Sequence, residues 1–247
     1  MEMDVPYFIL AALIFAGAFL FSAVGHGGAS GYLAAMALMG VSPQVMKPTA
    51  LALNILVAAI GTFQYCRAGA FSWHLFWPFA VASSPFAYLG GTLTLPGQVY
   101  KPLVGAVLIY AAWRSFHTAD RQQKVSGARP HRALLLLAGS ALGFLSGLTG
   151  VGGGIFLSPL LLFLRWAEVR VISGIAAAFI LVNSVAGLAG VMAAAPQWPA
   201  ALPYWAAAAG AGGLVGAEYG SRRLGNPAIQ KLLAGVLLIA GAKMIAA

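Results

Sequence analysis

Residues 147–164 read GLTGVGGGIFLSPLLLFL, an uncharged glycine-rich loop that runs directly into a short apolar segment. Residues 25–38, GHGGASGYLAAMAL, have the same order of glycines and apolar residues. The apolar parts, about 29–40 and 154–164, hold only 11 or 12 residues. A helix of that length reaches about 18 Å of a hydrocarbon core roughly 30 Å thick. The pattern predicts two broken or re-entrant helices in a membrane protein.

The composition of the whole chain also indicates a membrane protein. Of its 247 residues, 61% are apolar and 8% are charged, whereas soluble proteins ordinarily carry about 25% charged residues. No charged residue occurs within 5–46, 71–100, 133–164 or 171–217, and each interval exceeds the roughly 20 residues that one transmembrane helix needs. These properties exclude a disordered chain, a disulfide-stabilised secreted domain and a nucleic-acid-binding domain, despite the net charge of +9.

Charges, prolines and polar clusters divide the rest of the chain into eight longer apolar segments, and the order of segments repeats. The longer segments cover about 6–24, 48–65, 74–94, 100–114, 133–149, 171–193, 203–221 and 228–246. Gly25 and Gly27 match Gly150 and Gly152 at an offset of 125 residues, and Asn54 matches Asn183 at an offset of 129. We therefore predict an all-α integral membrane protein with two inverted repeats of about five helical segments each, in which short discontinuous helices follow the glycine-rich loops. The first repeat is expected at 1–115, a basic cytoplasmic linker at 116–131 and the second repeat at 132–247.

The lysines and arginines predict the orientation. If all ten segments cross, five per repeat make the halves inverted, and eleven basic residues lie on the side of the linker, against Lys47, Lys101 and Lys243 on the other. Re-entrant short segments would instead give a split of seven to seven. The positive-inside rule therefore favours ten crossings with both termini outside. We also expect Cys66 to be a small buried residue and the six tryptophans to be interfacial anchors.

The glycine loops have two interpretations. Glycine reaches positive φ without a Cβ clash, so consecutive N–H groups can converge on an anion, and the following helix adds about half a positive charge. Alternatively, small residues simply allow helices to pack closely. Under the first interpretation the substrate-binding candidates are glycines, hydroxyls, one histidine and two asparagines: Gly25, His26, Gly27, Gly28, Ser30, Thr49, Asn54, Gly150, Gly152, Gly153, Gly154, Ser158 and Asn183.

Several polar candidates also have a structural alternative. His26 could bind an anion or change charge near neutral pH, or it could be a neutral imidazole bonded to a backbone carbonyl. Asn54 and Asn183 could reach the substrate or bond the backbone of a neighbouring helix. The hydroxyls, individually, are expected to donate to the i−4 carbonyl of their own helix.

Catalysis is not expected. The sequence shows no paired carboxylates, no metal-ligand spacing and no nucleophile with a matching base, so we predict no enzyme activity, no cofactor and no metal. The expected partners are a small anionic substrate and the lipid bilayer, and a homodimer is left open. The alternative to a transporter is a non-transporting membrane scaffold or assembly protein whose glycines only pack helices.

The two glycine stretches, with the helix ISGIAAAFILVNSVAGLAG at 172–190, resemble the TauE/SafE family of membrane transporters, the sulfite exporter family. The resemblance covers nearly the whole chain and is strongest from Gly143 to Gly190, whereas His26 and Ser30 depart from the family pattern. It implies a multi-pass carrier in the bacterial inner membrane for sulfite, sulfonates or related anions. By matched position it implies substrate contacts at Gly27, Gly28, Gly152, Gly153, Asn54 and Asn183.

Overall fold

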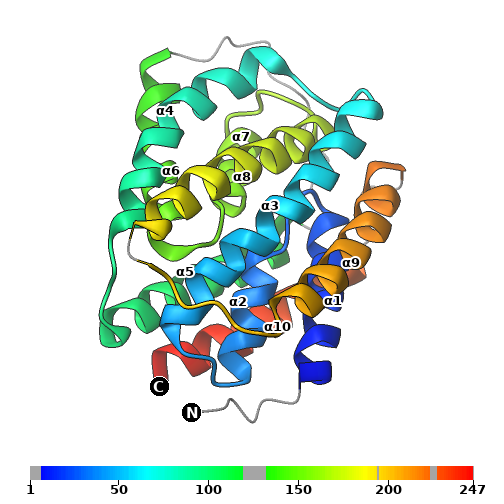
Figure 1. Cartoon of the computed structure of the whole chain (residues 1–247). Helices are drawn as coiled ribbons and strands as arrows, with labels where there is room; N and C mark the ends of the chain where they lie inside the picture. Colours follow the sequence, from blue (N-terminus) through cyan, green and yellow to red (C-terminus); the bar gives the residue numbers. More distant parts are fainter. Residues whose placement is uncertain (1–6, 119–131, 194, 223–226, 247) are drawn as a thin grey trace.

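The computed structural model describes residues 7–118, 132–193, 195–222 and 227–246, and these residues form ten helices and no strand. The helices, in chain order, are α1 Tyr7–Ser22, α2 Ala29–Leu38, α3 Pro43–Arg67, α4 Trp73–Thr92, α5 Gly97–Thr118, α6 Arg132–Thr149, α7 Gly154–Phe163, α8 Val169–Met192, α9 Leu202–Arg222 and α10 Pro227–Ala246 (Figure 1). Each predicted apolar segment corresponds to one helix, so the predicted all-α fold is confirmed. The predicted linker at 116–131 lies outside the described residues from residue 119 onward.

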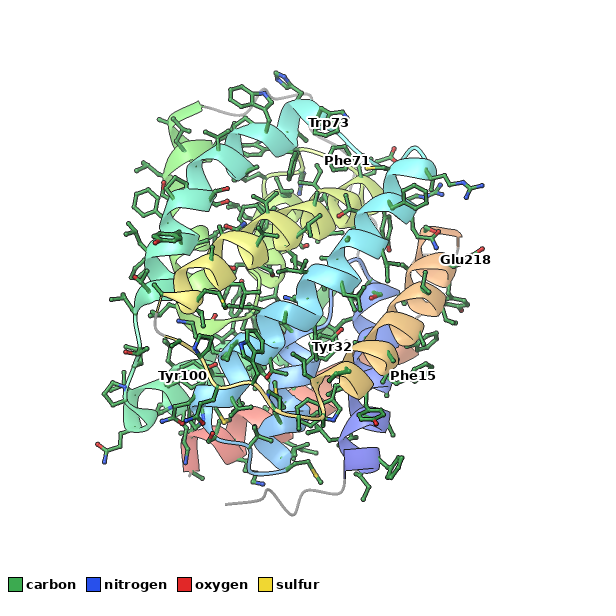
Figure 2. All side chains as sticks on the ribbon, in the orientation of Figure 1. Phe15, Tyr32, Phe71, Trp73, Tyr100 and Glu218 are labelled. Atoms are coloured by element: carbon green, nitrogen blue, oxygen red, sulfur yellow. The ribbon has the colours of Figure 1, made fainter. Side chains whose placement is uncertain are left out.

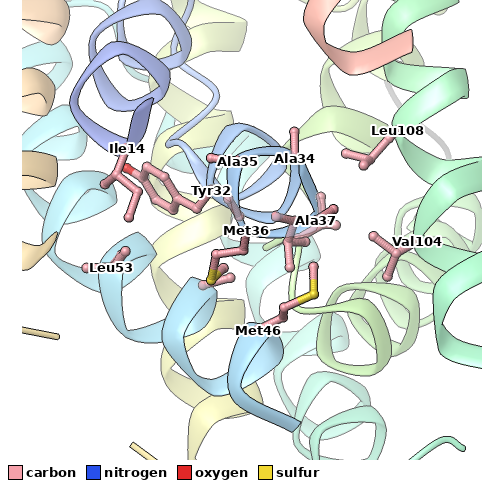
Figure 3. Packing of buried hydrophobic residues seen from close by; sticks show 14 of the residues in the cluster. Ile14, Tyr32, Ala34, Ala35, Met36, Ala37, Met46, Leu53, Val104 and Leu108 are labelled. Atoms are coloured by element: carbon pink, nitrogen blue, oxygen red, sulfur yellow. The ribbon is translucent and has the colours of Figure 1, made fainter. Parts of the chain in front are cut away.

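The two predicted short segments form short helices. Both α2 and α7 have 10 residues, which is a length of about 15 Å. Nine residues of α2 are buried. Figure 3 shows Tyr32 and Met36 of this helix facing Ile14 and Leu53, while Ala34 and Ala37 face Val104 and Leu108. The short helix α2 is therefore enclosed by the other helices.

The helices α3 and α8 cross at the centre of the molecule in opposite directions (Figure 1). Gly61 lies beside Ala177, Asn54 bonds Ser184, and Leu51 lies beside Gly187, so residue numbers rise along one helix as they fall along the other. The pair α5 and α10 is also antiparallel, because Gly105 packs near Met244 and Ile245 while Ile109 packs near Gly241.

Two outer pairs of helices, α4 with α6 and α1 with α9, run parallel and pack through glycines. In the first pair Gly139, Gly143 and Gly147 of α6 face Phe79, Ser83 and Ala87. In the second, Gly212, Gly216 and Gly220 of α9 face Phe15, Phe19 and Ala23. A Cβ at most of these glycines would overlap a backbone carbonyl of the partner helix. Glycine at every fourth position thus lets the two backbones approach closely.

Basic side chains fasten helix ends at both ends of the molecule. At one end, the Lys47 end, Lys47 of α3 donates to the carbonyls of Gly90, Gly91 and Leu93 at 3.0–3.1 Å. At the opposite end, the Arg170 end, Arg170 of α8 donates to the carbonyl of Ser221 at 2.6 Å. A cation there satisfies carbonyls that the last turn of a helix leaves free. The start of α3 is thus tied to the end of α4, and the start of α8 to the end of α9.

The outer surface carries many large apolar side chains. Phe8 is 91% exposed, Leu137 72% and Tyr204 74%, and Figure 2 shows Trp73 at the Arg170 end. A soluble protein rarely exposes so much apolar surface, whereas a bilayer would cover it. By length and composition, α3 and α8 are the described helices that qualify individually as membrane spans, and about two thirds of each is enclosed.

Two expectations about single residues are wrong. Trp205 is fully buried and joins the core that includes Ile14 and Leu53, because the first turns of α9 pack inward against α1 and α3. It is therefore no interfacial anchor. Cys66 is exposed, because the last turn of α3 turns Tyr65 into the interior and the neighbouring cysteine outward.

Candidate functional site

The two glycine loops approach the centre of the molecule from opposite ends. The first loop, 23–28, starts at the Arg170 end, where the Val24 carbonyl accepts a hydrogen bond from Ser173 at 3.2 Å. The second loop, 150–153, starts at the Lys47 end, where Gly150 packs against Lys47. Gly27 and Gly152 then both lie against Asn54 and Ile180. The N-termini of α2 and α7 therefore meet near the crossing of α3 and α8.

The backbone of both loops requires glycine. Gly27 has φ +68° and Gly152 has φ +85°, and both values lie in the left-handed region that side chains disfavour. Gly25 and Gly150, matched in the sequence, share this conformation, and Gly153 has it as well. The predicted conformation of the glycine runs is therefore present in both loops.

Asn54 joins the two loops. Its Oδ1 accepts hydrogen bonds from the N–H groups of Gly28, at 3.2 Å, and Ala29, at 2.9 Å. Its Nδ2 donates to the carbonyl of Val151 and to the hydroxyl of Ser184, both at 3.4 Å. The side chain is fully buried. One amide on α3 thus caps α2 and at the same time contacts the second loop and α8.

The matched residue Asn183 has a different environment. Its Nδ2 donates to the carbonyl of Phe179 in its own helix at 2.8 Å. Its Oδ1 is buried without a hydrogen-bond partner in the part of the chain that the structure describes. Asn54 therefore bonds the backbone of neighbouring segments, as one interpretation predicted, while Asn183 bonds its own backbone.

The predicted hydroxyl candidates do not act alike. The expectation that each donates to its own helix is wrong for Thr49 and Ser158, whose hydroxyls are buried without a partner among the described residues. Thr149 does donate to the i−4 carbonyl of Leu145, at 2.7 Å. Ser30 is buried in the first turn of α2. Among the described residues, no side-chain hydrogen bond joins Thr49 or Ser158 to the meeting point of the loops.

His26 lies in the first loop before the meeting point. Its Nδ1 is 2.8 Å from the carbonyl oxygen of Val24. This is the geometry of an imidazole bonded to a backbone carbonyl, the structural alternative for this residue.

Sequence reasoning missed three residues near the second loop. Lys47, counted only as an external charge, is 7% exposed, and its alkyl chain lies beside Gly150. Tyr100 of α5 donates to the carbonyl of Thr149 at 2.9 Å. Ser146 lies beside Gly153, and its hydroxyl is buried without a partner in the described part of the chain. A serine one turn before a glycine run was the available signal for Ser146.

The loop glycines differ from the packing glycines in what surrounds them. A Cβ at Gly143 or Gly216 would meet the backbone of a neighbouring helix. A Cβ at Gly153 would meet the ring of Phe179 and the side chain of Ser146, and one at Gly154 would meet the side chain of Ile180 first. Side chains can change rotamer, whereas a packed backbone cannot move alone. Gly153 and Gly154, at the start of α7, are therefore enclosed mainly by side chains.

The described residues hold no group of three or more His, Cys, Asp or Glu side chains that could bind a metal ion.

Comparison with known proteins identifies the family. The family model described as Sulfite exporter TauE/SafE matches residues 9–244. The probable membrane transporter protein y4hK of Sinorhizobium fredii is 41% identical over 246 residues, which are 98% of this chain and 100% of that protein. The probable membrane transporter protein YjnA of Bacillus subtilis is 27% identical over 255 residues, 94% of this chain and 96% of that protein.

A probable membrane transporter protein of Methanocaldococcus jannaschii, MJ0441, is 28% identical over 145 residues, 57% of this chain and 53% of that protein. No solved structure matches. Because the family match runs through all ten helices, the chain belongs to the sulfite exporter TauE/SafE family of transmembrane transporters.

Proposed function

We propose that the protein is a secondary transporter that moves a small sulfur-containing anion, such as sulfite or an organosulfonate, across the cytoplasmic membrane by alternating access. The substrate would bind at the centre, where the two glycine loops meet Asn54. One observation carries this proposal. Two short helices direct their N-termini, from opposite ends of the molecule, at one buried place that a single amide spans.

Alternating access would come from two inverted repeats, residues 1–115 and 132–247. The helix pairs support this division. Each of α1–α5 corresponds to the helix five places later, so α4 corresponds to α9 and α1 to α6. The parallel pair α4 and α6 then corresponds to the parallel pair α9 and α1. The pairs α3 with α8 and α5 with α10 join each helix to its own counterpart, and both are antiparallel. A two-fold axis in the membrane plane reverses every helix, so it requires antiparallel counterparts.

Chemistry at the meeting point suits an anion. Each helix N-terminus contributes about half a positive charge, and its first backbone N–H groups are left free by the helix itself. The carboxylates of the described residues, Glu168 and Glu218, belong to the start of α8 and the last turns of α9, away from the centre. Sulfite and sulfonate groups offer three oxygens on one sulfur to such donors. The family description as sulfite exporters supports the sulfur chemistry.

The basic residues support an orientation with the Arg170 end in the cytoplasm. Arg67, Arg165 and Arg170 lie at that end of the helices, where the linker also leaves α5. Lys47, Lys101 and Lys243 lie toward the other end. The positive-inside rule then places both termini outside.

A thermal-shift panel tests the binding part of the proposal. Purified full-length protein in detergent is heated with sulfite, sulfate, thiosulfate, taurine or sulfoacetate, with chloride as the control. A ligand that binds only the folded state stabilises it by about 2.7 kcal/mol at 100 times its Kd. We expect at least one sulfur anion to raise the Tm in a saturable manner. Equal Tm values with all anions would contradict an anion site and favour the scaffold alternative.

A further inference from the structure

The two glycine loops differ in one respect that concerns the substrate. At α2, the N–H groups of Gly28 and Ala29 both donate to Oδ1 of Asn54. At α7, the matched groups belong to Gly153 and Gly154, and neither makes a hydrogen bond within the described parts of the chain. Both glycines are buried. Two donors are therefore satisfied at one helix, and their counterparts are left unpaired at the other.

A buried hydroxyl without a partner among the described residues lies beside Gly153. Ser146 of α6 is 0% exposed, and its Oγ has no hydrogen bond to any described residue. That oxygen lies 3.4 Å from the position that a Cβ would take at Gly153. The serine near the first loop behaves differently, because Ser22 donates to the carbonyl of Gly27 at 3.2 Å. Ser146 thus adds a third donor beside the N-terminus of α7.

We propose, on the basis of the function proposed above, that the oxyanion group of the substrate is held at the N-terminus of α7. The N–H groups of Gly153 and Gly154 and the hydroxyl of Ser146 are the donors. At α2, Oδ1 of Asn54 takes the place that an anion oxygen has at α7. The two loops therefore have different roles. The N–H groups after the first loop are bonded to Asn54, and those after the second loop bind the ligand.

Burial explains why the unpaired site favours a ligand. A buried N–H or O–H group without a partner is unstable relative to one that is bonded, and an anionic acceptor gives the strongest bond. The ring of Phe179 and the side chain of Ile180 cover the two glycines. On this proposal, rotation of these side chains would give the substrate access to the N-terminus of α7.

The test compares Ser146→Ala with the control variant Ser22→Ala, at the serine beside the first loop, in the full-length purified protein. Sulfite is titrated calorimetrically, and sulfoacetate is titrated in a parallel series, while Tm without ligand reports folding. We expect Ser146→Ala to raise the Kd about tenfold and to leave Tm unchanged or higher, because it removes a hydroxyl that bonds no described residue. We expect Ser22→Ala to lower Tm and to keep the Kd within twofold.

Three other outcomes separate the proposed anion site at α7 from the proposed transport function. If the wild type binds either anion and Ser146→Ala has an unchanged Kd, the anion site at the N-terminus of α7 is contradicted. The proposed transport function is not affected by that result. If only Ser22→Ala raises the Kd, the anion binds at the first loop, and the proposed site at α7 is contradicted. If the wild type neither binds nor transports any anion of the panel, both the proposed function and the proposed site at α7 are contradicted.

Discussion

At the scale of single residues, Asn54 connects the largest number of separate segments at the site. Its amide contacts the start of α2, the second glycine loop and α8. Asn183, at the matched position, keeps to its own helix. The two asparagines therefore differ in what they connect: Asn54 joins several segments, whereas Asn183 bonds the backbone of its own helix.

Replacing each asparagine by alanine should reveal this difference. Asn54→Ala leaves the N–H groups of Gly28 and Ala29 buried and unpaired, and we expect it to destabilise the protein by about 1–3 kcal/mol. Asn183→Ala removes one hydrogen bond within a helix, and the Oδ1 of this amide has no partner among the described residues. We therefore expect the free energy of unfolding to fall by about 1 kcal/mol or less. Unfolding of both variants in detergent measures the two losses. Equal losses would show that the bridge through Asn54 is not important for stability.

The left-handed glycine of the second loop should not tolerate a side chain. Gly152→Ala forces a Cβ to within 2.5 Å of Nδ2 of Asn54 at φ +85°. The backbone strain alone is about 1–2 kcal/mol. We expect a lower Tm and loss of sulfite binding. In the control, Gly61→Ala, the new Cβ lies 3.5 Å from Ala177 in a helix, so Tm should stay the same or rise. A tolerated Gly152→Ala would contradict the described loop.

Residue types at the site were largely predictable, but their bonds were not. The matched glycines and asparagines could be recognised from the sequence because both copies keep the same spacing. Which asparagine caps which helix depends on how α3 and α8 cross, and this follows from packing over distances that no local pattern encodes. Ser146 and Lys47 were missed because a lone serine or lysine at a helix end is usually solvated or bonded locally.

At the scale of helices, the glycine seams decide which elements touch. Three glycines on α6 and three on α9, each separated by four residues, let α4 and α1 pack at backbone distance. The ten helices themselves were predictable because charges and prolines bound each apolar run. The glycine spacing on α6 and α9 was not used as a prediction, although a glycine at every fourth residue marks one face of a helix. That spacing does not identify the partner helix.

Enlarging one glycine of a seam should separate a helix pair. In Gly143→Ala, the Cβ overlaps the carbonyl of Ser83, and overpacking of this kind typically destabilises by about 1–3 kcal/mol. In the control, Gly235→Ala on α10, the Cβ meets no atom within 4 Å, so stability should stay the same or rise slightly. Thermal unfolding in detergent distinguishes the two. A Gly143→Ala protein as stable as the wild type would mean that α4 and α6 are further apart.

The lysine that fastens α4 to α3 offers a second prediction at this scale. Lys47→Met keeps the length of the side chain but leaves the carbonyls of Gly90, Gly91 and Leu93 without their donor. We expect a loss of about 1–3 kcal/mol. Arg67→Met, at the exposed opposite end of α3, should change stability by less than about 0.5 kcal/mol. Similar effects of both changes would show that Lys47 does not cap α4.

At the scale of the whole molecule, the two glycine loops reach the centre from opposite ends. The first loop enters from the Arg170 end and the second from the Lys47 end. Relative rocking of the two halves would open the centre to one end at a time, as alternating access requires.

Cysteine labelling tests the orientation. In a Cys66→Ser background, Gln98→Cys places a thiol at an exposed position at the Lys47 end, and Glu168→Cys places one at the Arg170 end. We expect a membrane-impermeant maleimide to label Gln98→Cys in intact cells and Glu168→Cys only after permeabilisation, because basic residues favour the cytoplasmic side. The reverse pattern would place both termini inside.

The most direct test of anion transport is a flux measurement in proteoliposomes. The vesicles are loaded with sulfite and diluted into sulfite-free buffer, which sets up a sulfite gradient. Wild-type protein is compared with Ser146→Ala and with empty liposomes, at equal protein incorporation. We expect saturable sulfite flux in the wild type, competition by other sulfur oxyanions and a clear reduction of flux in Ser146→Ala. Flux no faster than in empty liposomes for every sulfur anion, from a correctly folded wild-type protein, would contradict the conclusion that the buried meeting point of the two loops carries an anion.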